Sequence, residues 1–116
     1  MTSELNDSND DICVGYVTHP DKKHAQKIVD ALLKERLIAC AVYLSAESSY
    51  IWKGDITHDS ECITLLKTRH DLWDTVKERI IKIHEYDTPC ILQFSGKASE
   101  PYMQWLRNET QKAHTK

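Results

Sequence analysis

The sequence predicts an α+β fold in which two β-α-β units are joined by a long β-hairpin and followed by an extra C-terminal helix. Two segments, residues 21–36 and 69–84, have apolar residues at helical spacing. Each of them lies between short segments rich in β-branched residues, which are typical of strands. The resulting β-α-β-β-α-β order corresponds to a ferredoxin-like sandwich, with both helices on one face of the sheet.

The first strand and the first helix are predicted at residues 12–18 and 21–36. The strand is apolar toward both faces, as expected of a buried central strand. His19-Pro20-Asp21 ends it, and proline is well tolerated in the first turn of a helix. The helix then presents one apolar stripe, which consists of Ala25, Ile28, Val29, Leu32 and Leu33.

A hairpin is predicted to fill the middle of the chain. Its first arm begins as a strand at residues 37–43, is interrupted by a polar patch at residues 45–49, and resumes at residues 50–52. Lys53-Gly54-Asp55 is a turn signal. The returning strand is expected at residues 57–68, so the hairpin is long and irregular on its first arm.

The rest of the chain is predicted to hold a helix, a short strand and a last helix. Thr68 and Asp71 fit a capping box at the start of the helix at residues 69–84. The strand covers residues 90–94. Pro101 begins the last helix because proline suits its first turn.

The sheet and the aromatic residues together predict self-association. The strand at residues 12–18 is apolar on both faces, and the long hairpin arm leaves an open edge that is a liability unless another chain pairs with it. Trp73 and Trp105 lie on helical stripes and are expected in the core. Trp52 lies beside the hairpin turn, where it is either an exposed binding surface or, as we favour, an anchor in a neighbouring subunit.

Composition excludes several classes of protein. The 116 residues form one domain, and the net charge of −3 argues against a protein that neutralises phosphates. No apolar run approaches the ~20 residues of a membrane helix. Residues 1–11 have no positive side chain and no apolar segment, so no signal peptide is expected. The sequence therefore predicts a cytoplasmic protein without nucleic-acid or membrane partners.

Both ends of the chain are predicted to be tails. Residues 1–11 carry four acidic side chains and no lysine or arginine, which is typical of a disordered acidic segment. Residues 111–116 are similarly polar and form a flexible C-terminal tail. The folded domain is then expected at residues 12–110.

Motifs of other proteins with this element order are missing. The three glycines are scattered, so there is no phosphate-binding loop, and residues 18–21 lack the glycine of an acylphosphatase-like loop. The third strand lacks the aromatics of an RNA-binding sheet. No Cys-x-x-Cys follows the first strand, as it does in copper chaperones. No nucleophile–base pair is legible, so the sequence indicates no enzyme.

Cysteine and histidine side chains remain as candidates for binding. The four cysteines are widely spaced and form no Cys-x-x-Cys motif, which predicts free thiols that are mostly buried. His84 closes the second helix, where the helix dipole favours a cation. It is either a contact at the helix end or a ligand.

Six segments of the chain together resemble the CutA divalent-cation tolerance family over about residues 13–110. They are Tyr16-Val17-Thr18 with Pro20, Leu37-Ile38-Ala39-Cys40, Ser49-Tyr50-Ile51-Trp52-Lys53-Gly54, Leu66-Lys67-Thr68-Arg69, His84-Glu85-Tyr86-Asp87-Thr88-Pro89 and Tyr102-Met103-Gln104-Trp105-Leu106. The resemblance implies a ferredoxin-like homotrimer with Tyr50 and Trp52 at the subunit boundary. It also implies association with copper and other divalent metals, without an established catalytic activity.

The resemblance implies candidate metal ligands, although the sequence departs from the family motif. His84 and Cys40 match family positions suggested as ligands, while Glu85 and Cys90 replace a proline and a glutamate of the motif. We expect any site to use His84 with Cys90 or Asp87, completed by Cys40 of the same or a neighbouring subunit. Imidazole and thiolate favour Cu(I) and zinc. In the alternative interpretation, Cys90 is the first core residue of the last strand.

Two functions in different classes remain open. One is a non-catalytic, trimeric protein that binds copper or another divalent metal. The other is a trimeric regulatory module that binds a small molecule in clefts between subunits, like the nitrogen-signalling proteins.

Overall fold

The computed structural model describes residues 11–110, which fold into one sheet with helices on one face and across one end. The elements are β1 (Ile12–His19), α2 (Lys22–Lys34), β2 (Cys40–Trp52), β3 (Asp55–Arg69), a 3-10 helix (His70–Leu72), α3 (Trp73–Ile83), β4 (Ile91–Gly96) and α4 (Glu100–Glu109). The strands pair antiparallel in the order β2-β3-β1-β4. This confirms the predicted ferredoxin-like α+β fold. The two predicted tails lie outside the described residues, apart from Asp11.

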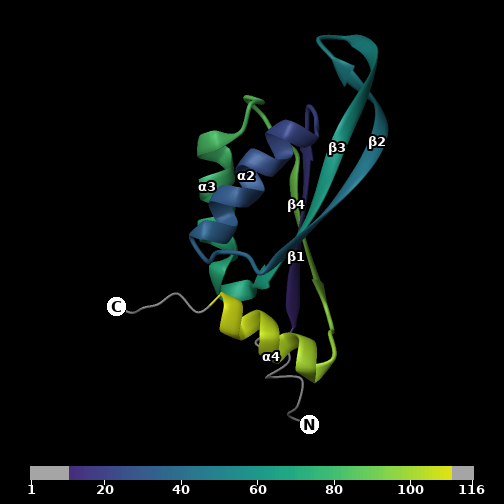
Figure 1. Cartoon of the computed structure of the whole chain (residues 1–116). Helices are drawn as coiled ribbons and strands as arrows, with labels where there is room; N and C mark the ends of the chain where they lie inside the picture. Colours follow the sequence, from purple (N-terminus) through teal and green to yellow (C-terminus); the bar gives the residue numbers. More distant parts are fainter. Residues whose placement is uncertain (1–10, 111–116) are drawn as a thin grey trace.

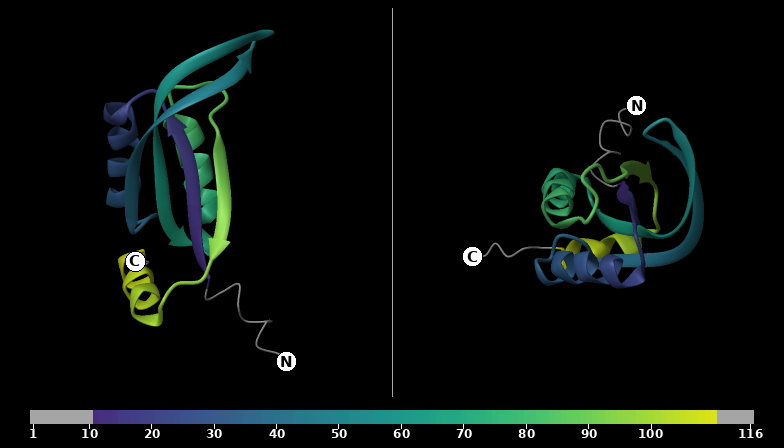
Figure 2. Two further views of the ribbon diagram at one scale, coloured as in Figure 1. Left: turned by 90° about the vertical axis from the view of Figure 1, so that its right-hand side faces the viewer. Right: turned by 90° about the horizontal axis from the view of Figure 1, so that it is seen from above.

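The helices α2 and α3 lie side by side on one face of the sheet, and α4 lies across one end (Figures 1 and 2). The main core fills the space between these two helices and the sheet, and its largest members include Leu32, Ile38, Leu66, Trp73 and Ile80. No helix within residues 11–110 is long and apolar enough to cross a membrane.

Gly15 allows α3 to pack closely against β1. A Cβ atom at residue 15 would lie 2.5 Å from the ring of Trp73, which is closer than side chains pack. Trp73 is buried, as predicted, because its ring occupies the space that a side chain at residue 15 would need.

The helix α2 forms because its ends are capped and its apolar stripe is buried. The carboxylate of Asp21 accepts a hydrogen bond of 2.8 Å from the backbone N–H of His24 at the first turn. Ala25, Ile28, Val29 and Leu32 are buried, whereas Leu33 is 38% exposed at the margin of the stripe.

The hairpin is more regular than the sequence predicts. The polar patch at residues 45–49 does not interrupt β2, which pairs continuously with β3 from Cys40 opposite Lys67 to Trp52 opposite Asp55. Polar cross-strand pairs stabilise this part: the Ser49 hydroxyl lies 2.8 Å from Nδ1 of His58. Lys53 and Gly54 both have positive φ, as a two-residue type I′ turn requires.

Two further local predictions are wrong. Thr68 does not cap α3: it stays in β3, and its hydroxyl donates a 2.6 Å hydrogen bond to the carbonyl oxygen of Leu37. A 3-10 turn follows, and α3 begins only at Trp73. Trp105 is 42% exposed instead of buried, because α4 packs Met103 and Leu106 against Ile12.

The sheet face opposite α2 and α3 is apolar and largely uncovered. We call it the open face. The register aligns Val42, Leu65, Tyr16 and Leu92 across the four strands on this face. Its most exposed large members, between 37% and 54% exposed, are Val42, Leu44, Leu92 and Phe94.

Candidate functional site

Three parts of the chain meet at one end of the sheet. They are the end of β1, the connector after α3, and the stretch of the hairpin around Ser48 and Glu61. His84 is the residue that joins them. Its Nε2 atom lies 2.8 Å from the carbonyl oxygen of Thr18, and its Nδ1 atom accepts a 2.9 Å hydrogen bond from the backbone N–H of Tyr86. A carbonyl oxygen only accepts, so Nε2 carries the proton. His84 is therefore a neutral imidazole with both ring nitrogens in use.

His19 stacks on His84 with ring centroids 5.2 Å apart and ring planes 15° apart. His19 is only 1% exposed, and its Nε2 atom lies 2.9 Å from the hydroxyl oxygen of Thr64. Burial, with a smaller contribution from the neighbouring His84 and His24, lowers the pKa of His19 to about 4. Burial also lowers the pKa of His84. The stacked pair is thus uncharged at neutral pH.

Tyr86 connects this histidine pair to the hairpin. Its hydroxyl donates a 2.8 Å hydrogen bond to one carboxylate oxygen of Glu61, and the other oxygen accepts a 2.7 Å bond from the hydroxyl of Ser48. Burial and the negative charge of Glu61 raise the pKa of Tyr86, so the phenol remains a hydrogen-bond donor. The connector is therefore tied to both arms of the hairpin.

The candidate metal ligands occupy two separate parts of the molecule. The carbonyl oxygen of Cys90 accepts a hydrogen bond from the backbone N–H of Thr18, so Cys90 lies at the same end of the sheet as His84. Asp87 and Cys90 are exposed. Cys40 pairs with Lys67 instead, toward the end of the sheet that α4 covers.

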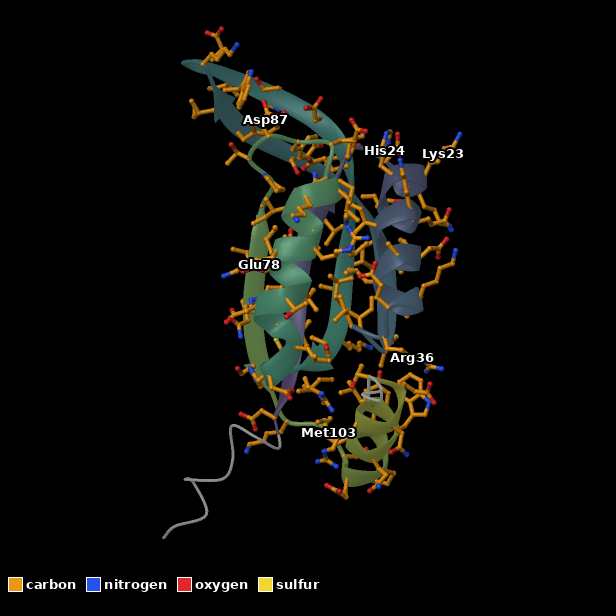
Figure 3. The ribbon with its side chains drawn as sticks, turned by 90° about the vertical axis from the view of Figure 1, so that its left-hand side faces the viewer. Lys23, His24, Arg36, Glu78, Asp87 and Met103 are labelled. Carbon is orange, nitrogen blue, oxygen red and sulfur yellow. The ribbon has the colours of Figure 1, made fainter. Side chains whose placement is uncertain are left out.

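In Figure 3, Asp87 lies at one end of the molecule and Met103 of α4 at the other. The structure thus brings His84, Asp87 and Cys90 to one region and leaves Cys40 out of it. Within residues 11–110, no three His, Cys, Asp or Glu side chains are grouped closely enough to hold a metal ion. Because Cys90 is exposed, the alternative that it is a core residue is wrong.

The sequence analysis missed His19, Thr64 and Glu61 as members of this region. One signal could have indicated His19. It follows Cys13, Gly15 and Val17 at a spacing of two, which places it on the helix-facing side of β1. The cross-strand partner Thr64 and the long-range partner Glu61 have no such local signal, because the register of β3 determines both contacts.

A family model described as CutA1 divalent ion tolerance protein matches residues 13–109. The chain belongs to the CutA1 divalent ion tolerance family. A divalent-cation tolerance protein CutA from Pyrococcus horikoshii is 47% identical over 84% of this chain and 96% of its own length. The crystal structure of CutA1 from the same organism covers 86% of this chain and 99% of its own, with 44% identity and a TM-score of 0.84. CutA1 from Ehrlichia chaffeensis gives a TM-score of 0.84 at 36% identity, over 87% of this chain and 96% of its own.

Other members of the CutA1 family overturn the prediction of a cytoplasmic location. One solved structure, from Archaeoglobus fulgidus, is described as a periplasmic divalent cation tolerance protein; it is 26% identical, covers 85% of this chain and 98% of its own, and has a TM-score of 0.83. A chloroplastic CutA protein from Arabidopsis thaliana is 36% identical over 84% of this chain, which spans 54% of that protein. Relatives occupy different compartments, so CutA1 membership does not specify the cytoplasm.

Proposed function

We propose that this protein is a homotrimeric, non-catalytic copper-binding protein that serves divalent-metal tolerance. The observation that carries this proposal is the match to the CutA1 family over residues 13–109, together with relatives that bear the name divalent-cation tolerance protein. The features of the chain that support assembly and metal binding are separate and can be tested separately.

Assembly is supported by apolar surface that one chain leaves exposed. Leu44 and Phe94 on the open face are 46% and 54% exposed. At the hairpin tip, Ile51, Trp52 and Ile56 are 67%, 58% and 71% exposed. Exposed apolar surface of this kind is typical of protein–protein interfaces. We propose that Trp52 and Tyr50 lie at the boundary between subunits.

Metal binding is proposed between subunits, because residues 11–110 of one chain do not by themselves group enough ligands for a site. Asp87 and Cys90 are exposed near His84 and can contribute a carboxylate and a thiolate, whereas Cys40 lies elsewhere in the same chain. A site that uses Nδ1 of His84 requires its hydrogen bond with the Tyr86 N–H to open. Thiolate ligands favour Cu(I) and zinc over magnesium and calcium.

The metal proposal is tested by titration of the purified protein with Cu(I) and Zn²⁺ under reducing conditions. We expect Cys90→Ser and His84→Ala to weaken binding, and Cys40→Ser to do so if a neighbouring subunit completes the site. Cys13→Ala is the matched control, because Cys13 is fully buried. If the three ligand variants bind as tightly as the wild type, the proposed residues do not form the site. Binding should also weaken as the pH falls, because thiolate binding releases a proton.

A further inference from the structure

A cavity lies between the start of α2 and the arms of the hairpin. Its volume is about 610 Å³. It is lined by Pro20, Asp21, Lys22, Tyr43, Leu44, Ser45, Ala46, Glu47, Ser60, Glu61 and Cys62. The hairpin extends past the start of α2 (Figure 1). Residues of both hairpin arms line one side of the cavity, and Pro20, Asp21 and Lys22 line the other. A cavity of this volume with both apolar and polar lining residues is typical of small-ligand sites.

Two of the charged groups in the cavity wall already form hydrogen bonds within the chain. Asp21 caps α2 and accepts hydrogen bonds of 2.8 Å from both the backbone N–H and the Nδ1 atom of His24. Glu61 accepts the hydroxyls of Ser48 and Tyr86, one on each oxygen. Neither carboxylate therefore has its full capacity available for a ligand.

Two other charged groups in the wall have opposite sign, and each lacks an ionic partner. Within residues 11–110, the side chain of Glu47 forms no hydrogen bond or ion pair, and Lys22 has no carboxylate partner. The Nζ atom of Lys22 lies 5.8 Å from the centroid of the Tyr43 ring. The cavity thus presents one available cation and one available anion.

The strand geometry sets the spacing of the residues along one wall of the cavity. Tyr43 and Glu47 lie on the same face of β2, four residues apart, which corresponds to about 13 Å along a strand. Lys22 is at the Tyr43 end, so the cation and the anion lie at opposite ends of the cavity. Ser45 of the same face lies between them, and Ser60 pairs with Glu47. Their hydroxyls can bond the polar groups of a ligand that spans this distance.

We propose that this cavity binds an elongated zwitterion of the size of a tripeptide, with its carboxylate at Lys22 and its ammonium group at Glu47. An extended tripeptide spans about 10 Å, which fits within the roughly 13 Å between Tyr43 and Glu47 along β2. A single amino acid is too short to contact both charges. This inference goes beyond the metal-tolerance proposal and does not depend on it.

The test is calorimetric titration of the assembled protein with trialanine. We expect saturable binding that is absent or much weaker for alanine, because only the longer probe contacts both charges. N-acetyl-trialanine and trialanine amide, which each lack one charge, should bind about fivefold more weakly, the effect of losing one partly solvated ion pair.

Matched variants assign each end of the probe. Lys22→Gln should weaken the binding of trialanine and N-acetyl-trialanine, which carry the carboxylate, but leave the affinity for trialanine amide nearly unchanged. Glu47→Gln should weaken the binding of trialanine and trialanine amide, which carry the ammonium group, but leave the affinity for N-acetyl-trialanine nearly unchanged. Lys27→Gln and Glu78→Gln, exposed residues outside the cavity, should bind all probes like the wild type. The proposal is overturned if trialanine does not bind at millimolar concentration, if alanine binds equally well, or if neither cavity variant changes the affinity. Failure here leaves the copper titration unaffected, so the two proposals are distinguished.

Discussion

His84 and Thr18 are joined by a 2.8 Å hydrogen bond between the imidazole Nε2 atom and a backbone carbonyl oxygen, across 66 residues of sequence. This bond fixes the tautomer of His84, and the Tyr86 N–H occupies its other nitrogen. The imidazole therefore fastens the connector after α3 to the end of β1. A residue at the end of a helix thus has a structural role whether or not it binds a metal.

Replacement of His84 should destabilise the fold. His84→Ala removes two hydrogen bonds and the stacking partner of His19, which predicts a loss of about 2 kcal/mol in the free energy of unfolding. Urea denaturation at fixed protein concentration measures this. His58→Ala is the control, since His58 is exposed on the hairpin, and its loss should be much smaller. Equal effects of the two variants would show that the His84 contacts contribute little.

Stability should decrease in mild acid because of His19. Its pKa is about 4 in the folded protein and 6.5 as the ordinary value. Below pH 6.5 the unfolded chain therefore binds a proton that the folded chain does not, and the folded state loses stability until the pH falls to about 4. The difference corresponds to about 3 kcal/mol.

The acid effect of His19 is measured by urea denaturation between pH 7.5 and 4, a range that spans the interval between the two pKa values. A His19→Gln variant keeps a hydrogen-bonding group but does not titrate, so it should show a flatter profile than the wild type. An unchanged profile in that variant would assign the acid sensitivity to other groups.

A charge on the open face should prevent assembly. Phe94 is 54% exposed on that face, so Phe94→Glu places a carboxylate in the proposed interface, where its desolvation is costly. We expect a lower native mass by light scattering. Ile81→Glu, which is 53% exposed on α3, is the matched control and should leave the mass unchanged. A monomeric wild type at micromolar concentration would contradict the trimer outright.

Gly15→Ala should be more damaging than Gly96→Ala. The new Cβ atom would lie 2.5 Å from the Trp73 ring at residue 15, but 3.7 Å from its nearest neighbour at residue 96. Overpacking of this kind costs about 1–3 kcal/mol, so the melting temperature of Gly15→Ala should fall well below that of Gly96→Ala. Neither glycine has a positive φ, so the comparison isolates the steric effect. Similar melting temperatures would mean that α3 moves away at little cost.

The sequence predicts the helices and turns whose residue pattern lies within one short segment. It does not predict contacts that depend on how the strands are aligned with one another. The stripe of α2 is visible because its buried residues recur at helical spacing, and the Lys53-Gly54 turn is visible because its backbone needs positive φ. Thr68 matched a helix cap locally, but its hydroxyl finds Leu37, 31 residues away. A helix cap and a strand position are alternative roles for Thr68, and in this structure it is part of the strand.

In the candidate site, too, the residue with a local signal was predicted and its long-range partners were not. His84 was identified from its place at a helix end and from the family resemblance, and the structure does place it at a junction. Its partner His19 was predicted only as part of a strand end. The interruption expected at residues 45–49 did not occur, because polar side chains on both arms pair with one another across the hairpin.

The uninterrupted register of the hairpin limits how this part of the chain can change in length. From Cys40 opposite Lys67 to Trp52 opposite Asp55, each residue of β2 has one partner on β3. An insertion of one residue in one arm would turn all residues beyond it to the opposite face, including the apolar tip. Two added residues on each arm would preserve both pairing and facing. The hairpin can therefore lengthen or shorten only in matched steps, while the body of the domain stays unchanged.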